Sequence, residues 1–109
     1  MATSYKVLGQ LNPAATTLST LYTCGAANGA VGSTLVICNE SSISTTARVA
    51  VRPAGAAIDP KHYILYDAPV SGNDSLYLTI GVALANTDVV SVYGGTANLA
   101  FNLFGSEMS

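Results

Sequence analysis

The side chains that could carry out acid–base or nucleophilic chemistry are few in this sequence and lie far apart. His62 is the only histidine, and Cys24 and Cys38 are the only cysteines. General acid–base catalysis needs paired titratable groups in one cleft, and His62, at the start of an expected strand, is better explained as a structural residue. No G-x-S-x-G sequence is present to expose a nucleophilic serine. We therefore predict no catalytic residues and no enzymatic activity.

Metal ligands are also too few and too scattered. A structural zinc site needs about four Cys, His or carboxylate ligands at close spacing, and the two cysteines and one histidine do not supply them. Calcium takes about six to eight oxygen ligands, so a site built from two turn aspartates is the minor alternative. We expect no metal ion and no cofactor. The aspartates of the expected turns, where such side chains usually bond nearby backbone N–H groups, are Asp59, Asp67, Asp74 and Asp88.

The two cysteines are expected to be reduced thiols. The segment Met1–Lys6 has no charged leader followed by an apolar stretch, which favours synthesis in a cytoplasm, where thiols usually stay reduced. A disulfide that closes the loop between them is the alternative. If the strands that carry Cys24 and Cys38 pair as a hairpin, their offset of about 15 Å exceeds the ~7 Å limit between bridged Cα atoms.

Charged residues are unusually scarce. Four basic and six acidic residues make up 9% of the chain, where soluble domains typically carry ~25%. With 50% hydrophobic residues the chain can bury a core and is not disordered, and its length suits a single domain, residues 1–109. Four cations offer no basic stripe for a phosphate backbone, and the apolar runs are far shorter than the ~18 residues of a membrane helix. We expect neither a nucleic-acid nor a membrane partner.

The elements that position the histidine, cysteine and aspartate side chains are expected to be β-strands and the turns between them. Short runs rich in Val, Ile, Leu, Thr and Tyr alternate with clusters of Gly, Pro, Asn, Asp and Ser, which is typical of strands separated by turns. We predict an all-β fold: a two-sheet antiparallel sandwich, jelly-roll-like, of about eight strands. The expected strands are Tyr5–Leu8, Thr17–Thr23, Ser33–Asn39, Thr45–Arg52, His62–Tyr66, Leu76–Ala83, Asp88–Tyr93 and Ala97–Phe104.

Alternation of apolar and polar residues assigns the strand faces. Short turns at Asn86–Asp88 and Gly94–Thr96 predict that the last three strands form an antiparallel meander, and Gly25–Gly32 is expected to close a hairpin between the second and third. Val89 is the alternative to Val90 and Val92 as the buried row of its strand. The predicted core residues are Val49, Val51, Leu78, Ile80, Val90, Val92, Leu99 and Phe101.

Two loops and one strand are more apolar than usual. The loops Cys24–Gly32 and Pro53–Pro60 are small and nearly uncharged. They are either ordinary Gly/Ala linkers or surfaces buried against a neighbour. The run Leu35–Cys38 is continuously apolar, as in a strand that is covered on both faces. We expect its second face to be covered by the other sheet with a loop, or by another copy of the chain.

Three strings spread over almost the whole chain resemble small virion proteins of tailed bacteriophages: Tyr5–Gln10, Ala50–Ala56 and Ala97–Gly105. Phages of aquatic bacteria are the nearest association. Some small β-sandwiches of such particles act as capsid decoration, or cement, proteins. The resemblance implies a virion protein made in the host cytoplasm. By analogy with decoration proteins at three-fold capsid positions, it implies a homotrimer first and a dimer second.

The leading hypothesis is therefore a non-enzymatic virion structural protein that binds and stabilises the capsid shell, through contact with the major capsid protein or another virion protein. The alternative is a carbohydrate- or receptor-binding module of the virion or tail, for which six tyrosines could supply stacking faces, although Trp is absent. Scarce charge favours contact through uncharged loops and chain ends. The predicted interface residues are Tyr5, Ala54, Ala56, Ala57, Ile58 and Phe104.

Overall fold

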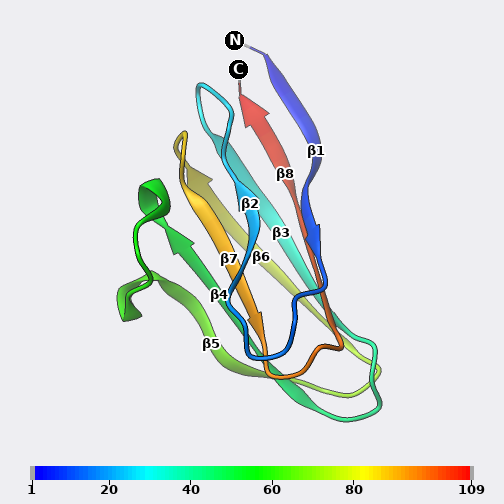
Figure 1. Cartoon of the computed structure of the whole chain (residues 1–109). Coiled ribbons are helices and arrows are strands. Elements are labelled where there is room, and N and C mark those ends of the chain that lie inside the picture. Colours follow the sequence, from blue (N-terminus) through cyan, green and yellow to red (C-terminus); the bar gives the residue numbers. More distant parts are fainter. Residues whose placement is uncertain (1, 109) are drawn as a thin grey trace.

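Residues 2–108 are described by the structure, a computed structural model, and they form eight strands and two short 3₁₀ turns (Figure 1). The turns, Pro53–Gly55 and Pro60–His62, lie between β4 and β5. No helix in this range is long and apolar enough to cross a membrane. The strands are β1 (Thr3–Leu11), β2 (Ser19–Thr23), β3 (Ala30–Asn39), β4 (Thr45–Arg52), β5 (Tyr63–Val70), β6 (Ser75–Leu84), β7 (Val89–Gly94) and β8 (Leu99–Met108).

The strands form two four-stranded antiparallel sheets that pack face to face as a sandwich. Sheet A has the order β1-β8-β3-β6, and sheet B has the order β2-β7-β4-β5. The first strand thus pairs with the last, β2 with β7, β3 with β6, and β4 with β5. This nested pairing is the connectivity of a jelly roll. The predicted two-sheet, jelly-roll-like sandwich is confirmed.

Two expected strand pairings are wrong. β6 and β8 lie in sheet A with β3 between them, and β7 lies in sheet B, so the last three strands do not form a meander. β2 and β3 also lie in different sheets, so the loop between them does not close a hairpin. A tight turn fixes a reversal of the chain, but it does not decide whether the chain returns in the same sheet or crosses ~10 Å to the facing one.

The inward rows of the two sheets meet in one core. Val51, Leu78 and Ile80 face this core but are only half-buried, because β6 is an edge strand and Val51 lies near the end of β4. Val89 is also buried, but on the outer face of sheet B, where Gly55 of the first 3₁₀ turn lies against it. The predicted core residues that are buried are Val49, Val90, Val92, Leu99 and Phe101.

Two buried polar side chains fix loops between strands. The Asn39 amide donates hydrogen bonds to the carbonyl oxygens of Ile43, at 2.9 Å, and Val70, at 3.2 Å. The Nδ1 of His62 accepts a hydrogen bond from the backbone N–H of Asp59 at 3.1 Å. His62 is therefore a hydrogen-bonded structural residue, as its position in the sequence indicated.

Cys24 and Cys38 are free thiols. Cys24 is packed in the core just after β2, whereas Cys38 is half-buried in the outward row of β3. The expected absence of a bridge thus agrees with the structure, but the hairpin geometry used to predict it does not. The two thiols are separated because they belong to different sheets and face different sides of the sandwich.

Phe101→Ala should lower the free energy of unfolding by ~3–5 kcal/mol, because Phe101 is fully buried on a central strand and its truncation leaves a cavity between the sheets. Urea-induced unfolding measures this loss. The control is Ile43→Ala, which removes a side chain that is 73% exposed and should change stability by less than ~0.5 kcal/mol. Equal losses in the two variants would contradict the assignment of the core.

Candidate functional site on the two outer faces

The outer face of sheet A carries no charged side chain. Residues opposite one another in neighbouring strands point to the same side of a sheet, so the strand register identifies every outward position. We call this set the uncharged face. Its members are Thr3, Tyr5, Val7 and Gln10 of β1; Ala100, Asn102, Phe104, Ser106 and Met108 of β8; Val31, Thr34, Val36 and Cys38 of β3; and Ser75, Tyr77, Thr79 and Ala83 of β6.

Large hydrophobic side chains on the uncharged face are exposed to solvent. Tyr5 is 85% exposed and Phe104 is 36% exposed, and both line a shallow groove of about 530 Å³ at the terminal end of the sheet. Lys6 of the inward row of β1 also lines this groove, with its ammonium group paired to Glu107. Val36 and Cys38 remain half-buried. Of the two expected covers for this second face of β3, the facing sheet with a loop is wrong, because that sheet covers only the inward side of the strand. Another copy of the chain stays a prediction.

A polar network ties the terminal strands to the facing sheet. Lys6 Nζ lies 2.7 Å from Glu107 Oε1, and the Tyr22 hydroxyl of β2 donates a hydrogen bond to Glu107 Oε2 at 2.5 Å. Burial, reinforced by the bond to Glu107, raises the pKa of Tyr22. The bond from Lys6, followed by that from Tyr22, lowers the pKa of Glu107. The network holds in place the part of β1 and β8 that bears Tyr5 and Phe104.

The outer face of sheet B has different chemistry, centred on Arg48. Its guanidinium carbon lies 4.2 Å from the ring centroid of Tyr66 and 4.3 Å from that of Tyr93. Arg48 Nε also donates a hydrogen bond to Asp67 Oδ1 at 2.6 Å, and this bond raises the pKa of Arg48 further above its usual range. Three strands, β4, β5 and β7, thus contribute to one aromatic and ionic cluster.

The loop between β4 and β5 is fixed to the same face by backbone hydrogen bonds. Arg52 Nη1 donates to the carbonyl oxygen of Ala56 at 3.0 Å, and the Asp88 carboxylate accepts from the Ala54 N–H at 2.9 Å. Ala54 adopts a positive φ of 53°, a conformation that this anchoring holds in place. The loop is therefore a defined surface, and its alanine side chains are exposed.

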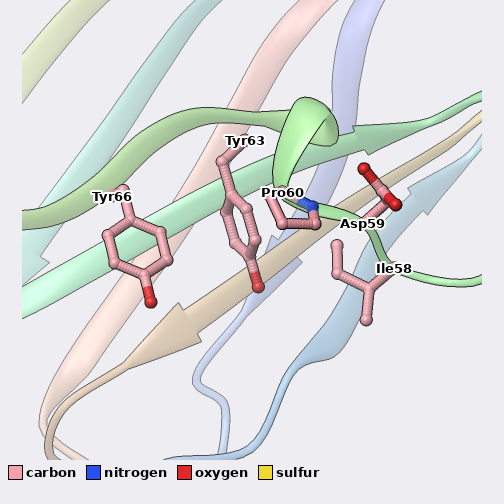
Figure 2. A pocket seen from close by; sticks show the side chains of 5 residues that line it. All are labelled: Ile58, Asp59, Pro60, Tyr63 and Tyr66. Carbon is pink, nitrogen blue, oxygen red and sulfur yellow. The ribbon is translucent and has the colours of Figure 1, made fainter.

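A groove of about 590 Å³ lies where this loop meets β5. It is lined by residues that are close in sequence, and the two tyrosine rings are nearly perpendicular, at 85°, with their centroids 5.0 Å apart. Figure 2 shows both rings on one side of the loop's second 3₁₀ turn and an isoleucine on the other. The lining residues are Ile58, Asp59, Pro60, Tyr63 and Tyr66.

The six predicted interface residues are exposed, but they do not form one surface. Tyr5 and Phe104 lie together on the uncharged face, whereas the alanines and Ile58 lie on the loop attached to sheet B. Sequence analysis missed the cluster around Arg48. Alternation placed Arg48 outward, but only the register shows that Tyr93 is its direct neighbour. The predicted loop residues in this second group are Ala54, Ala56, Ala57 and Ile58.

Comparisons of the chain with models of known protein families, with curated proteins and with solved structures find no match. Within residues 2–108, no three His, Cys, Asp or Glu side chains come together in an arrangement that could hold a metal ion. The functional interpretation therefore depends on the chemistry of the two outer faces.

Glu107→Gln should lower the melting temperature at neutral pH and weaken the response to acid. Because the folded-state pKa of Glu107 is lowered, its stabilisation is present above the ordinary carboxyl pKa of about 4.5 and is lost as pH falls through the folded value. The variant and the wild type should therefore converge in acid. Thermal unfolding across pH tests this, with Glu40→Gln, an exposed turn glutamate, as the control. A constant difference at every pH would contradict it.

Proposed function

We propose that this protein is a non-enzymatic structural subunit of a virus particle, of the capsid decoration or cement type, that assembles through its uncharged face. One observation carries the proposal: the outward rows of all four strands of sheet A contain no Asp, Glu, Lys or Arg, while large hydrophobic side chains there are exposed. An exposed apolar surface of this kind is typical of a protein–protein interface. The exposed members are Tyr5, Val7, Tyr77 and Phe104.

Apolar burial, rather than charge, would stabilise this assembly. Burial of apolar area contributes ~25 cal/mol per Å², whereas an exposed ion pair contributes only ~0–1 kcal/mol. Lysine or proline usually protects a sheet edge against association. The edge strand β6, Ser75–Leu84, contains neither proline nor a charged residue, and its one irregularity is a shift of register against β3 at Ile80 and Gly81. We therefore expect an association that depends little on salt.

The proposed partners are further copies of this chain and the shell of the particle. A homotrimer is the first expectation and a dimer the second, bound to the major capsid protein or another virion protein. Two observations support this assignment: the resemblance of three segments to small phage virion proteins, and a jelly roll, an architecture that viral capsid domains share. Many symmetric copies would provide avidity that no single contact supplies. The protein would be made in the host cytoplasm and reside in the virion.

We assign different roles to the two groups of predicted interface residues. Tyr5 and Phe104 belong to the uncharged face and would contact other copies of the chain. Ala56 and its neighbours belong to the anchored loop on the other sheet and would contact the shell. This division follows from their separation on the molecule.

Phe104→Asp should dissociate the oligomer, because it places a charge on the uncharged face of a central strand. Light scattering after size-exclusion chromatography measures the mass. The matched control is Thr20→Asp, which adds the same charge at an exposed position of β2 in sheet B and should leave the mass unchanged. A monomeric wild type, or an oligomer that survives Phe104→Asp, would contradict the proposal. Circular dichroism establishes that both variants are folded.

Ala56→Asp should prevent incorporation into the particle, while the isolated subunit still folds and self-associates, because the side chain of Ala56 is exposed in the subunit. Co-sedimentation with shells that lack the protein measures incorporation. Ser44→Asp, in the exposed loop between β3 and β4, is the control and should join the particle normally. Normal incorporation of Ala56→Asp, or release of the wild type by high salt, would show that the loop is not the shell contact.

A further inference from the structure

We propose that the groove between the β4–β5 loop and β5 binds a neutral hexopyranose unit of a glycan. The groove is on sheet B, away from the uncharged face through which copies of the chain would associate. It shares Ile58 with the loop that we propose contacts the shell, so glycan binding is a property of the subunit outside the particle. Its ligand class follows from three features: an aromatic ring with one open face, side chains that fix that ring, and one carboxylate, Asp59, in the lining of the groove.

Tyr66 supplies the stacking surface. The Arg48 guanidinium covers one face of its ring at 4.2 Å, yet the residue is still 59% exposed, so the other face is open to solvent. In Figure 2 the Tyr66 ring is seen face-on and the Tyr63 ring nearly edge-on, so the edge of Tyr66 points toward Tyr63 and leaves the open face free. The apolar C–H face of a pyranose ring fits such a platform.

The platform is held in position before any ligand arrives. Arg48 is itself fixed by stacking on Tyr93 at 4.3 Å and by the hydrogen bonds that its Nε and Nη2 donate to the Asp67 carboxylate. A ring that is already oriented loses little conformational freedom on binding, which favours affinity for a small ligand. Tyrosine also has few rotatable bonds and a hydroxyl that can bond a sugar.

The surroundings of the platform favour hydroxyl-rich, uncharged ligands. Ile58 and Pro60 of the loop form an apolar wall opposite the two tyrosines, and Asp59 supplies the one carboxylate among the lining residues. Carboxylates accept hydrogen bonds, and sugar hydroxyls donate them. Asp67 is paired with Arg48, and Asp59 lies next to the turn that carries Lys61, so the groove has no excess of either charge to attract an ionic ligand. An apolar concave site with a few polar groups is the usual form of a small-ligand site.

A proline-rich peptide is the other ligand that aromatic grooves commonly bind. Proline has no backbone N–H, so such a segment offers few donors to the Asp59 carboxylate of this groove. A pyranose carries several hydroxyl donors on one ring. The carboxylate acceptor therefore favours the sugar.

The experiment is a ¹H–¹⁵N NMR titration of the intact protein with the methyl glycosides of glucose, galactose and mannose, followed by an array of neutral oligosaccharides. We expect at least one neutral glycoside to shift the resonances of Tyr63 and Tyr66. Tyr66→Ala should weaken that binding at least tenfold, whereas Tyr66→Phe should retain most of it. The matched control is Ile43→Ala, which removes a large side chain that is 73% exposed in the β3–β4 loop, outside both proposed surfaces, and should leave binding unchanged.

Several outcomes would overturn the proposal: no binding to any neutral glycan, binding only to sulfated or sialylated glycans, equal loss in Tyr66→Ala and Ile43→Ala, or saturable binding of a poly-proline peptide at this groove instead. The thermal unfolding midpoint of Tyr66→Ala should stay near that of the wild type, because the side chain is largely exposed. Its oligomeric mass should also be unchanged. Failure of glycan binding and failure of assembly are therefore distinguishable.

Discussion

The structure depends on burial of the inward row of β8, Leu99, Phe101 and Leu103, between the two sheets. β8 lies between β1 and β3 in sheet A, so its register fixes theirs. A slip of one residue would move this row to solvent and bring the outward row inside. Burial of three large side chains therefore also decides which residues face outward, and with them the composition of the uncharged face.

The few charges of the chain are segregated by this arrangement. Arg48, Arg52 and Asp67 lie on sheet B, and Lys6 and Glu107 bond to each other at the terminal edge of the sandwich. The outer face of sheet A receives none. Only 9% of the residues are charged, which is too few to place a charge on every face. Here the outward row of one whole sheet is left without charge. The outer face of sheet A is therefore suited to association, whereas the outer face of sheet B carries the cluster of Arg48, Asp67 and two tyrosines.

In the β4–β5 loop, hydrogen bonds from side chains to the loop backbone create a groove from a segment that has few functional side chains. Its residues are mainly alanine, glycine and proline, which carry no strong functional group. Asp88 and Arg52 nevertheless bond its backbone, and Asp59 and His62 bond each other's backbone across its second 3₁₀ turn. The loop thereby forms a wall opposite Tyr63 and Tyr66. An ordered wall and a fixed ring together make the groove.

The sequence alone determined the strands, their faces and the class of fold, because apolar residues that alternate with polar ones, as in Leu99–Leu103, are local signals of a half-buried strand. It also showed that Arg48 faces outward. Only the tertiary structure decided that β6 and β7 belong to different sheets and that Tyr66 and Tyr93 flank Arg48. The physical reason is that a turn specifies only that the chain reverses direction. The sheet that a strand joins, and its register there, depend on how much apolar surface is buried against strands that are distant in the chain.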